Sequence, residues 1–164
     1  MAAKMDAKRK KVIEVLNKAR AMELHAISQY MDQHYVLDDL DYGRLAKKIK
    51  QISIDEMRHA EMLAERIKDI DGVPTHEHTG VMKKNQPINE IYPLDVALED
   101  DTIEKYNEFM QICRDNGDNV SAELFKTLLL AEQEHYNYFD DEDQHLKTLG
   151  NAYLAEVAGS GAAD

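Results

Sequence analysis

The sequence repeats one pattern of ionisable residues: a glutamate, followed 33 residues later by a second glutamate that opens a Glu-x-x-His motif. The two copies are Glu23, Glu56 and His59, and Glu99, Glu132 and His135. The midpoint of each glutamate pair falls in turn-like sequence, within residues 37–43 and 114–118. Two helical hairpins with arms of equal length would bring four carboxylates and two imidazoles to one level. The pattern therefore predicts a site for two metal ions inside a four-helix bundle.

These six residues continue the apolar stripes of the expected helices. Glu23 follows Leu16 by seven residues, and Glu132 follows Phe125 by the same distance. Burial of unpaired carboxylates is costly, and four of them together would repel one another. No Lys or Arg of the stripes stands beside them, so two divalent cations are the expected source of positive charge. Mixed carboxylate and imidazole ligands suit iron or manganese, and the remaining coordination positions would admit dioxygen or peroxide.

The rest of the sequence predicts an all-α fold, because Gly and Pro are scarce and all three Pro residues lie between 74 and 93. Helices are expected at about 8–37, 42–70, 94–115, 118–146 and 151–157. The linker at 71–93 would reach about 70 Å if extended, whereas a helix of 28 residues is only about 42 Å long. It can therefore run the length of the bundle and leave the second and third helices parallel. One long crossover is typical of the ferritin-like bundle, so residues 1–164 are expected to form a single ferritin-like domain.

The composition limits the kinds of binding partner and the cellular compartment that we expect. The net charge of −12 disfavours nucleic acid, and the basic cluster at 8–11 is interpreted as a solvated helix start rather than a DNA-binding arm. No apolar run approaches the ~18 residues that span a bilayer, and no signal-peptide core is present. Cys113 is the only cysteine, which excludes an intrachain disulfide. We expect a cytoplasmic protein without membrane or nucleic-acid partners.

Three further features have less specific interpretations. A third Glu-x-x-His motif, Glu142 to His145, lies in an acidic run and is expected on the surface. The His-Glu-His segment at 76–78 lies in the linker and is expected to be a solvated loop. Three tyrosines are expected to pack in the core, although each could lie near the metal site: Tyr30, Tyr106 and Tyr138.

Met57 lies about 100° around its helix from the inward stripe, on a face with the small residues Ser53, Ala60 and Ala64. Such a face would let a flat group or another subunit approach. Taken alone, this pattern favours packing over a ligand role for Met57.

Four segments of the chain resemble the bacterioferritins, the haem-containing branch of the ferritin family: residues 21–30, 53–61, 98–100 and 132–135. The similarity extends from about residue 11 to residue 157. The Asp-Glu-Met-Arg-His segment at 55–59 is the most specific, because it joins the metal motif to the methionine that binds haem in that family. The resemblance implies a four-helix bundle with a short fifth helix. It also implies a hollow shell of 24 subunits, built from twofold dimers, that stores a ferric mineral.

The resemblance also implies roles for individual residues. Glu56 and Glu132 would bridge two iron ions, Glu23 and Glu99 would be terminal carboxylates, and His59 and His135 would be imidazole ligands. Met57 would be the axial ligand of an iron porphyrin shared with a twofold-related subunit. The chain departs from some family members at Gln51, where they carry an inner-surface histidine, and Asp55 remains a candidate for guiding iron there.

The implied function is iron storage, with a diiron ferroxidase that oxidises Fe²⁺ by O₂ or H₂O₂ and a haem that assists iron release. A ferredoxin-like protein is the expected electron donor. Two alternatives are a rubrerythrin-like peroxidase and a DNA-binding mini-ferritin shell. The first normally carries a Cys-rich domain, which a chain with one cysteine cannot supply. The second places its metal site between subunits, whereas all six residues here map within one bundle.

Overall fold

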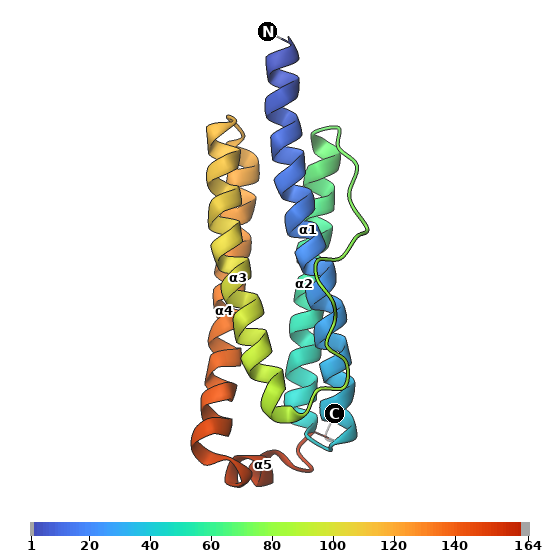
Figure 1. Cartoon of the computed structure of the whole chain (residues 1–164), viewed down its shortest axis with the longest axis vertical. Coiled ribbons are helices and arrows are strands. Elements are labelled where there is room, and N and C mark those ends of the chain that lie inside the picture. Colours follow the sequence, from blue (N-terminus) through green and yellow to red (C-terminus); the bar gives the residue numbers. More distant parts are fainter. Residues whose placement is uncertain (1, 162–164) are drawn as a thin grey trace.

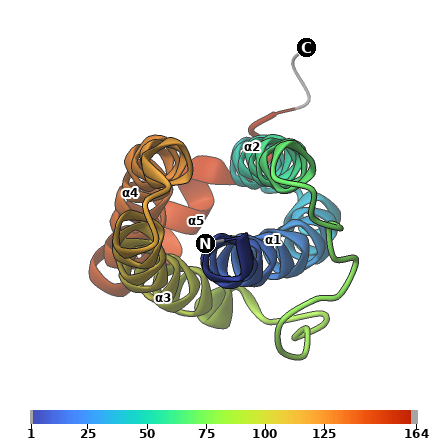
Figure 2. The ribbon, with the colours of Figure 1, turned by 90° about the horizontal axis from the view of Figure 1, so that it is seen from above.

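The computed structural model describes residues 2–161 and contains five helices within that range. They are α1 (Ala2–Asp39), α2 (Gly43–Asp69), α3 (Ile88–Asp115), α4 (Asn119–Leu149) and α5 (Asn151–Val157). The hairpins α1–α2 and α3–α4 lie side by side, and α5 crosses one end of the bundle (Figures 1 and 2). This is the expected four-helix bundle with a short fifth helix. Among residues 2–161, none of the helices combines the length and apolar character that crossing a membrane requires.

Residues 70–87 connect α2 to α3 by running along the outside of α1 from one end of the bundle to the other (Figure 1). Side chains of α1 hold this linker in place. Gln29 bonds to both the backbone N–H and the carbonyl of Lys83, and Asp32 accepts a bond from the backbone N–H of Asn85. Because the linker returns to the opposite end, α2 and α3 are parallel, as the length argument predicted.

Two apolar clusters fill the bundle, one toward each end. The first includes Leu16, Leu63, Tyr106 and Phe125, and the second includes Tyr30, Ile49, Tyr92 and Phe139. Every long helix contributes to both clusters, and its predicted ligand residues lie between its two contributions. The polar centre is therefore enclosed by dry, close-packed layers that fix its position along all four helices.

The third helix begins at Ile88, so the expected start at about residue 94 is wrong. Pro93 lies inside α3, where it removes one backbone N–H from the helical ladder. Ile91 and Tyr92, just before it, are fully buried and anchor this first part of the helix to the core. The burial of these two side chains offsets the lost hydrogen bond. This stabilisation comes from tertiary packing, so the local sequence around the proline does not reveal it.

Candidate metal centre

The six predicted ligands converge at one level of the bundle. Two sets of four ligand atoms form, each with all members within 4.8 Å of one another. One set is Glu23, Glu56, His59 and Glu132, and the other is Glu56, Glu99, Glu132 and His135. Glu56 and Glu132 belong to both sets, so the geometry offers two adjacent cation positions with two carboxylates in common. All six residues are buried and all come from one chain.

Both imidazoles present their Nδ1 atoms to the same two carboxylates. His59 Nδ1 lies 2.8 Å from Glu56 Oε2 and 3.0 Å from Glu132 Oε1, yet these three atoms have no hydrogen-bond partner of suitable angle. His135 Nδ1 lies 3.1 Å from Glu56 Oε1 and 3.1 Å from Glu132 Oε2. Buried polar atoms normally find partners. Several of them left unpaired and directed at one another fit a shared cation between them.

The electrostatics of the centre also favour cation binding. Burial and repulsion from neighbouring carboxylates raise the pKa of Glu23 and of Glu99 well above the ordinary glutamate value. Burial also opposes ionisation of Glu56, but contacts with His135 and His59 outweigh it and lower the pKa of Glu56 to about 2. Burial likewise disfavours both imidazolium forms. Contacts with the two shared carboxylates nevertheless raise the pKa of His59 to about 9 and that of His135 to about 11. Protons and cations therefore compete for the same groups, and metal binding would release protons.

Two tyrosines support the carboxylates that belong to only one set. The Tyr106 hydroxyl donates to Glu23, and the Tyr30 hydroxyl donates to Glu99. Burial raises the pKa of both phenols well above the ordinary tyrosine value, so both stay protonated donors. Tyr138, the third tyrosine considered from the sequence, instead packs against Tyr92 and Phe139 in the apolar cluster.

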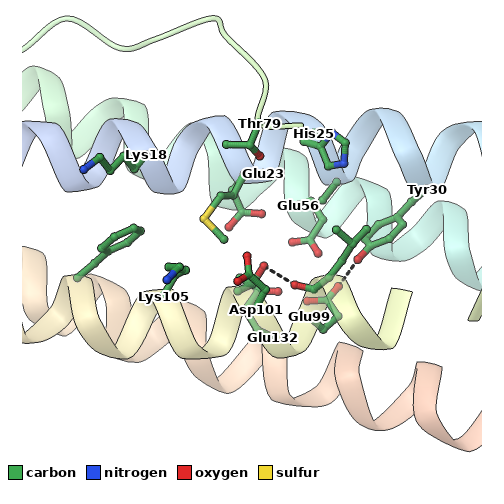
Figure 3. Close-up of a pocket in the computed structure, with 15 residues that line it drawn as sticks. Lys18, Glu23, His25, Tyr30, Glu56, Thr79, Glu99, Asp101, Lys105 and Glu132 are labelled. Carbon is green, nitrogen blue, oxygen red and sulfur yellow. Dashed lines mark hydrogen bonds between the residues drawn. The ribbon is translucent and has the colours of Figure 1, made fainter. Parts of the chain in front are cut away.

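A cavity of about 270 Å³ opens beside the centre between α1 and α3, under Thr79 of the linker. Glu23 and Glu56 reach toward it from one helix pair, and Glu99 and Glu132 reach toward it from the other (Figure 3). All four carboxylates line this cavity, but neither His59 nor His135 does.

The imidazole side of the centre faces a different part of the surface. His135 Nε2 lies 3.9 Å from Asp55 Oδ2, and the Asp55 side chain is 33% exposed. Asp55 is also bonded by Arg58 at 3.0 Å and by Gln51 at 3.3 Å. Gln51 therefore lies beside Asp55 on the same face of α2.

Met57 lies outside the metal centre and is 55% exposed. It lines an open groove of about 410 Å³ formed by α1 and α2. The other lining residues are Arg20, Leu24, Ile27, Ala60, Glu61 and Ala64. The mostly aliphatic lining fits a flat apolar group, and Arg20 and Glu61 add one charge of each sign.

The other candidate motifs are not part of either ligand set. His76, Glu77 and His78 are exposed linker residues, in agreement with the prediction of a solvated loop. Glu142 is only 12% exposed and accepts a hydrogen bond from Tyr153 of α5, so its predicted surface position is wrong. His145 is 50% exposed. The acidic character of this segment suggested full exposure, but α5, which follows it in the chain, covers Glu142.

Comparison with known proteins shows which family has this sequence and fold. Residues 13–149 match the ferritin-like domain family. The bacterioferritin of Desulfovibrio desulfuricans is 52% identical over 160 residues, which cover 98% of this chain and 89% of the relative. The bacterioferritin of Brucella melitensis is 37% identical over 147 residues, which cover 90% and 91% of the two chains.

Solved structures of bacterioferritins have the same fold as this chain. A crystal structure of the Desulfovibrio desulfuricans bacterioferritin, described with its diiron site in different catalytic states, matches with a TM-score of 0.95 at 51% identity. That match covers 97% of this chain and 93% of the other. The Mycobacterium tuberculosis bacterioferritin matches with a TM-score of 0.85 at 31% identity, over 90% and 93%.

The fold and the centre thus define a ferritin-like protein with carboxylate and imidazole groups gathered for metal binding. Within that class, the chain belongs to the bacterioferritin family. This result confirms the resemblance drawn from residues 55–59 and the all-α, ferritin-like fold.

Proposed function

We propose that this chain is a subunit of an iron-storage protein and that its six-residue centre is a ferroxidase. The observation that carries the proposal is the pair of four-ligand sets sharing Glu56 and Glu132. Membership of the bacterioferritin family, one of whose structures is described with a diiron site, supports it. The convergence of all six side chains inside one bundle favours it over a DNA-coating mini-ferritin, whose site would lie between subunits.

The substrate is Fe²⁺, two ions for each centre. Glu56 and Glu132 would bridge the ions, Glu23 and Glu99 would bind one ion each, and His59 and His135 would complete the two ligand sets. Each Fe²⁺ gives up one electron. O₂ accepts two electrons and two protons and leaves as H₂O₂, or H₂O₂ accepts two electrons and two protons and leaves as two waters. The Fe³⁺ product would then be stored as mineral.

The chain's own residues prepare this chemistry. Tyr30 and Tyr106 fix the orientation of the two outer carboxylates, and the apolar clusters exclude water on both sides of the centre. Both imidazole Nδ1 atoms already point at the shared carboxylates, so little reorganisation is needed when ions bind.

A haem group would bind at the Met57 groove, where the Met57 sulfur would hold it. The groove is open on one side, so a second copy of the chain would have to complete it with its own methionine. A haem held in this way would supply electron transfer. It would assist reduction and release of stored iron, with a ferredoxin-like protein as donor. We propose an assembly of 24 subunits built from such dimers.

The test is aerobic addition of Fe²⁺ to the purified metal-free protein, followed by ferric absorbance. The double variant Glu23→Ala with His135→Ala should lose rapid oxidation. His145→Ala is the matched control, because it removes the histidine of the third Glu-x-x-His motif and should oxidise iron normally. If the double variant is as fast as wild type, the assignment of the centre is wrong.

A further inference from the structure

We propose that the cavity between α1 and α3 is the path by which the oxidant, rather than Fe²⁺, reaches the centre. The inference rests on the proposed ferroxidase function and assigns a role to the residues between the surface and the carboxylates. The centre has two sides that differ in their side chains. Of the six ligand residues, only the four glutamates border the cavity, while the two histidines lie on the side that faces Asp55, a partly exposed acid on α2.

The walls of the cavity are mostly apolar. Met22 and Ala26 form the α1 wall, and Leu98 and Phe109 contribute from α3. These side chains offer no oxygen ligands to a divalent cation, which would have to shed its hydration shell to pass. O₂ and H₂O₂ are small and uncharged, and an apolar passage imposes no comparable desolvation cost on O₂.

The polar groups of the wall include an imidazole, a carboxylate and a hydroxyl. His25 is buried, and Asp101 is an exposed acid on α3. The hydroxyl of Thr102 donates to the carbonyl of Leu98 and is thereby occupied within its own helix.

The rim of the cavity carries charges of both signs, two lysines and the acid Asp101, although the whole chain carries −12. Lys18 and Lys105 lie at one end of the cavity (Figure 3). Lys18 pairs with Glu14 at 2.7 Å, and Lys105 pairs with Glu108 at 3.6 Å. An entrance for Fe²⁺ would be expected to gather acids without such counter-charges, because a field of one sign raises the local concentration of the opposite ion.

The experiment separates cation binding from oxidation in the full-length protein. Two variants narrow the cavity from opposite walls without touching a ligand: Ala26→Leu on α1 and Thr102→Leu on α3. Met22→Leu is the control, since it alters the same wall at nearly constant volume. Binding of Co²⁺ to the metal-free protein is followed by its visible absorbance in a stopped-flow instrument. Separately, protein loaded anaerobically with two Fe²⁺ per subunit is mixed with O₂ at several concentrations.

The expected result is that at least one narrowing variant reacts with O₂ about tenfold more slowly, with Co²⁺ binding at the wild-type rate and stoichiometry. Met22→Leu should match wild type in both measurements. Unchanged O₂ rates in both narrowing variants would overturn the proposal, as would slower Co²⁺ binding in both of them. A wild-type protein that binds Co²⁺ but does not oxidise loaded Fe²⁺ would instead refute the ferroxidase function.

Discussion

The hydroxyl of Tyr30 in α1 donates a hydrogen bond to Oε1 of Glu99 in α3 at 2.5 Å. The same relationship runs in the opposite direction, from Tyr106 in α3 to Glu23 in α1. In each helix the tyrosine follows the glutamate by seven residues, so two helical turns separate the ligand that a helix supplies from the donor that it offers its neighbour. The centre is thus reinforced reciprocally across the two hairpins.

These two hydrogen bonds predict that removing either tyrosine hydroxyl destabilises the protein. Tyr30→Phe or Tyr106→Phe leaves a buried carboxyl oxygen without its partner, which should lower the free energy of unfolding of the metal-free protein by about 1–3 kcal/mol. Guanidinium unfolding measures the change. Tyr35→Phe is the control, because Tyr35 is 62% exposed. Equal stabilities for wild type and the buried variants would show that these hydroxyls contribute nothing.

The sharing of two carboxylates predicts unequal effects of similar substitutions. Glu56 belongs to both ligand sets, whereas Glu23 belongs to one. Glu56→Ala should therefore weaken binding at both positions, and Glu23→Ala should leave one Co²⁺ per subunit bound tightly. Titration of the metal-free protein with Co²⁺ gives the two stoichiometries. Identical losses in the two variants would contradict two adjacent positions with a common ligand.

The start of α4 predicts a pH dependence of stability. Asp118 accepts a bond from the Ser121 N–H at 2.9 Å and pairs with Arg66 of α2 at 2.9 Å. Burial opposes ionisation, but hydrogen bonds from Ser121 and Arg66 outweigh it and lower the pKa of Asp118. A carboxylate with a depressed folded-state pKa stabilises the fold above its unfolded pKa of about 3.9, and this contribution is lost as the pH falls through the folded value.

Asp118→Asn should therefore lower the free energy of unfolding by about 1 kcal/mol at pH 7, the usual scale for a helix cap with a partly exposed ion pair. The difference from wild type should shrink below about pH 4 as Asp118 is protonated. Urea unfolding at several pH values measures it. A difference that stays constant from pH 7 to pH 3 would show that the charge of Asp118 has no part in it.

Met57 lies outside the metal centre, so we expect its substitution to affect porphyrin binding without affecting Fe²⁺ oxidation. Met57→Leu keeps the size of the side chain but should reduce porphyrin binding, since the sulfur ligand is gone. The visible spectrum of the purified variant reports the porphyrin, and Fe²⁺ oxidation should proceed at the wild-type rate. A full porphyrin band in Met57→Leu would exclude Met57 as the axial ligand.

Hydrophobic periodicity predicted the four long helices, because it reports which side chains face inward. The length of the linker predicted the parallel crossover, and the equal spacing of the two glutamate pairs predicted the level at which the six ligands meet. Neither periodicity nor spacing reports which inward groups touch across helices. The tyrosine bonds are one example, and Glu142 beneath α5 is another. Pro93 inside α3 shows that burial of Ile91 and Tyr92 can outweigh a local helix breaker.

A buried polar network was also absent from the sequence-based expectations. Asp95 is fully buried, accepts a bond from Gln33 at 2.8 Å, and has its pKa raised well above the ordinary value by burial. Gln33 also donates to Gln86 of the linker at 3.0 Å. Asp95 precedes Glu99 by four residues on the same face of α3, and that spacing was the available signal. The linker partner could be known only from the fold.

Anomalous diffraction from crystals soaked anaerobically with Fe²⁺ tests the central claim most directly. We expect two iron peaks in each subunit at mid-bundle, one within the set that contains Glu23 and His59 and one within the set that contains Glu99 and His135, with Glu56 and Glu132 between them. A single peak, or iron bound elsewhere while these six side chains keep their metal-free positions, would contradict it.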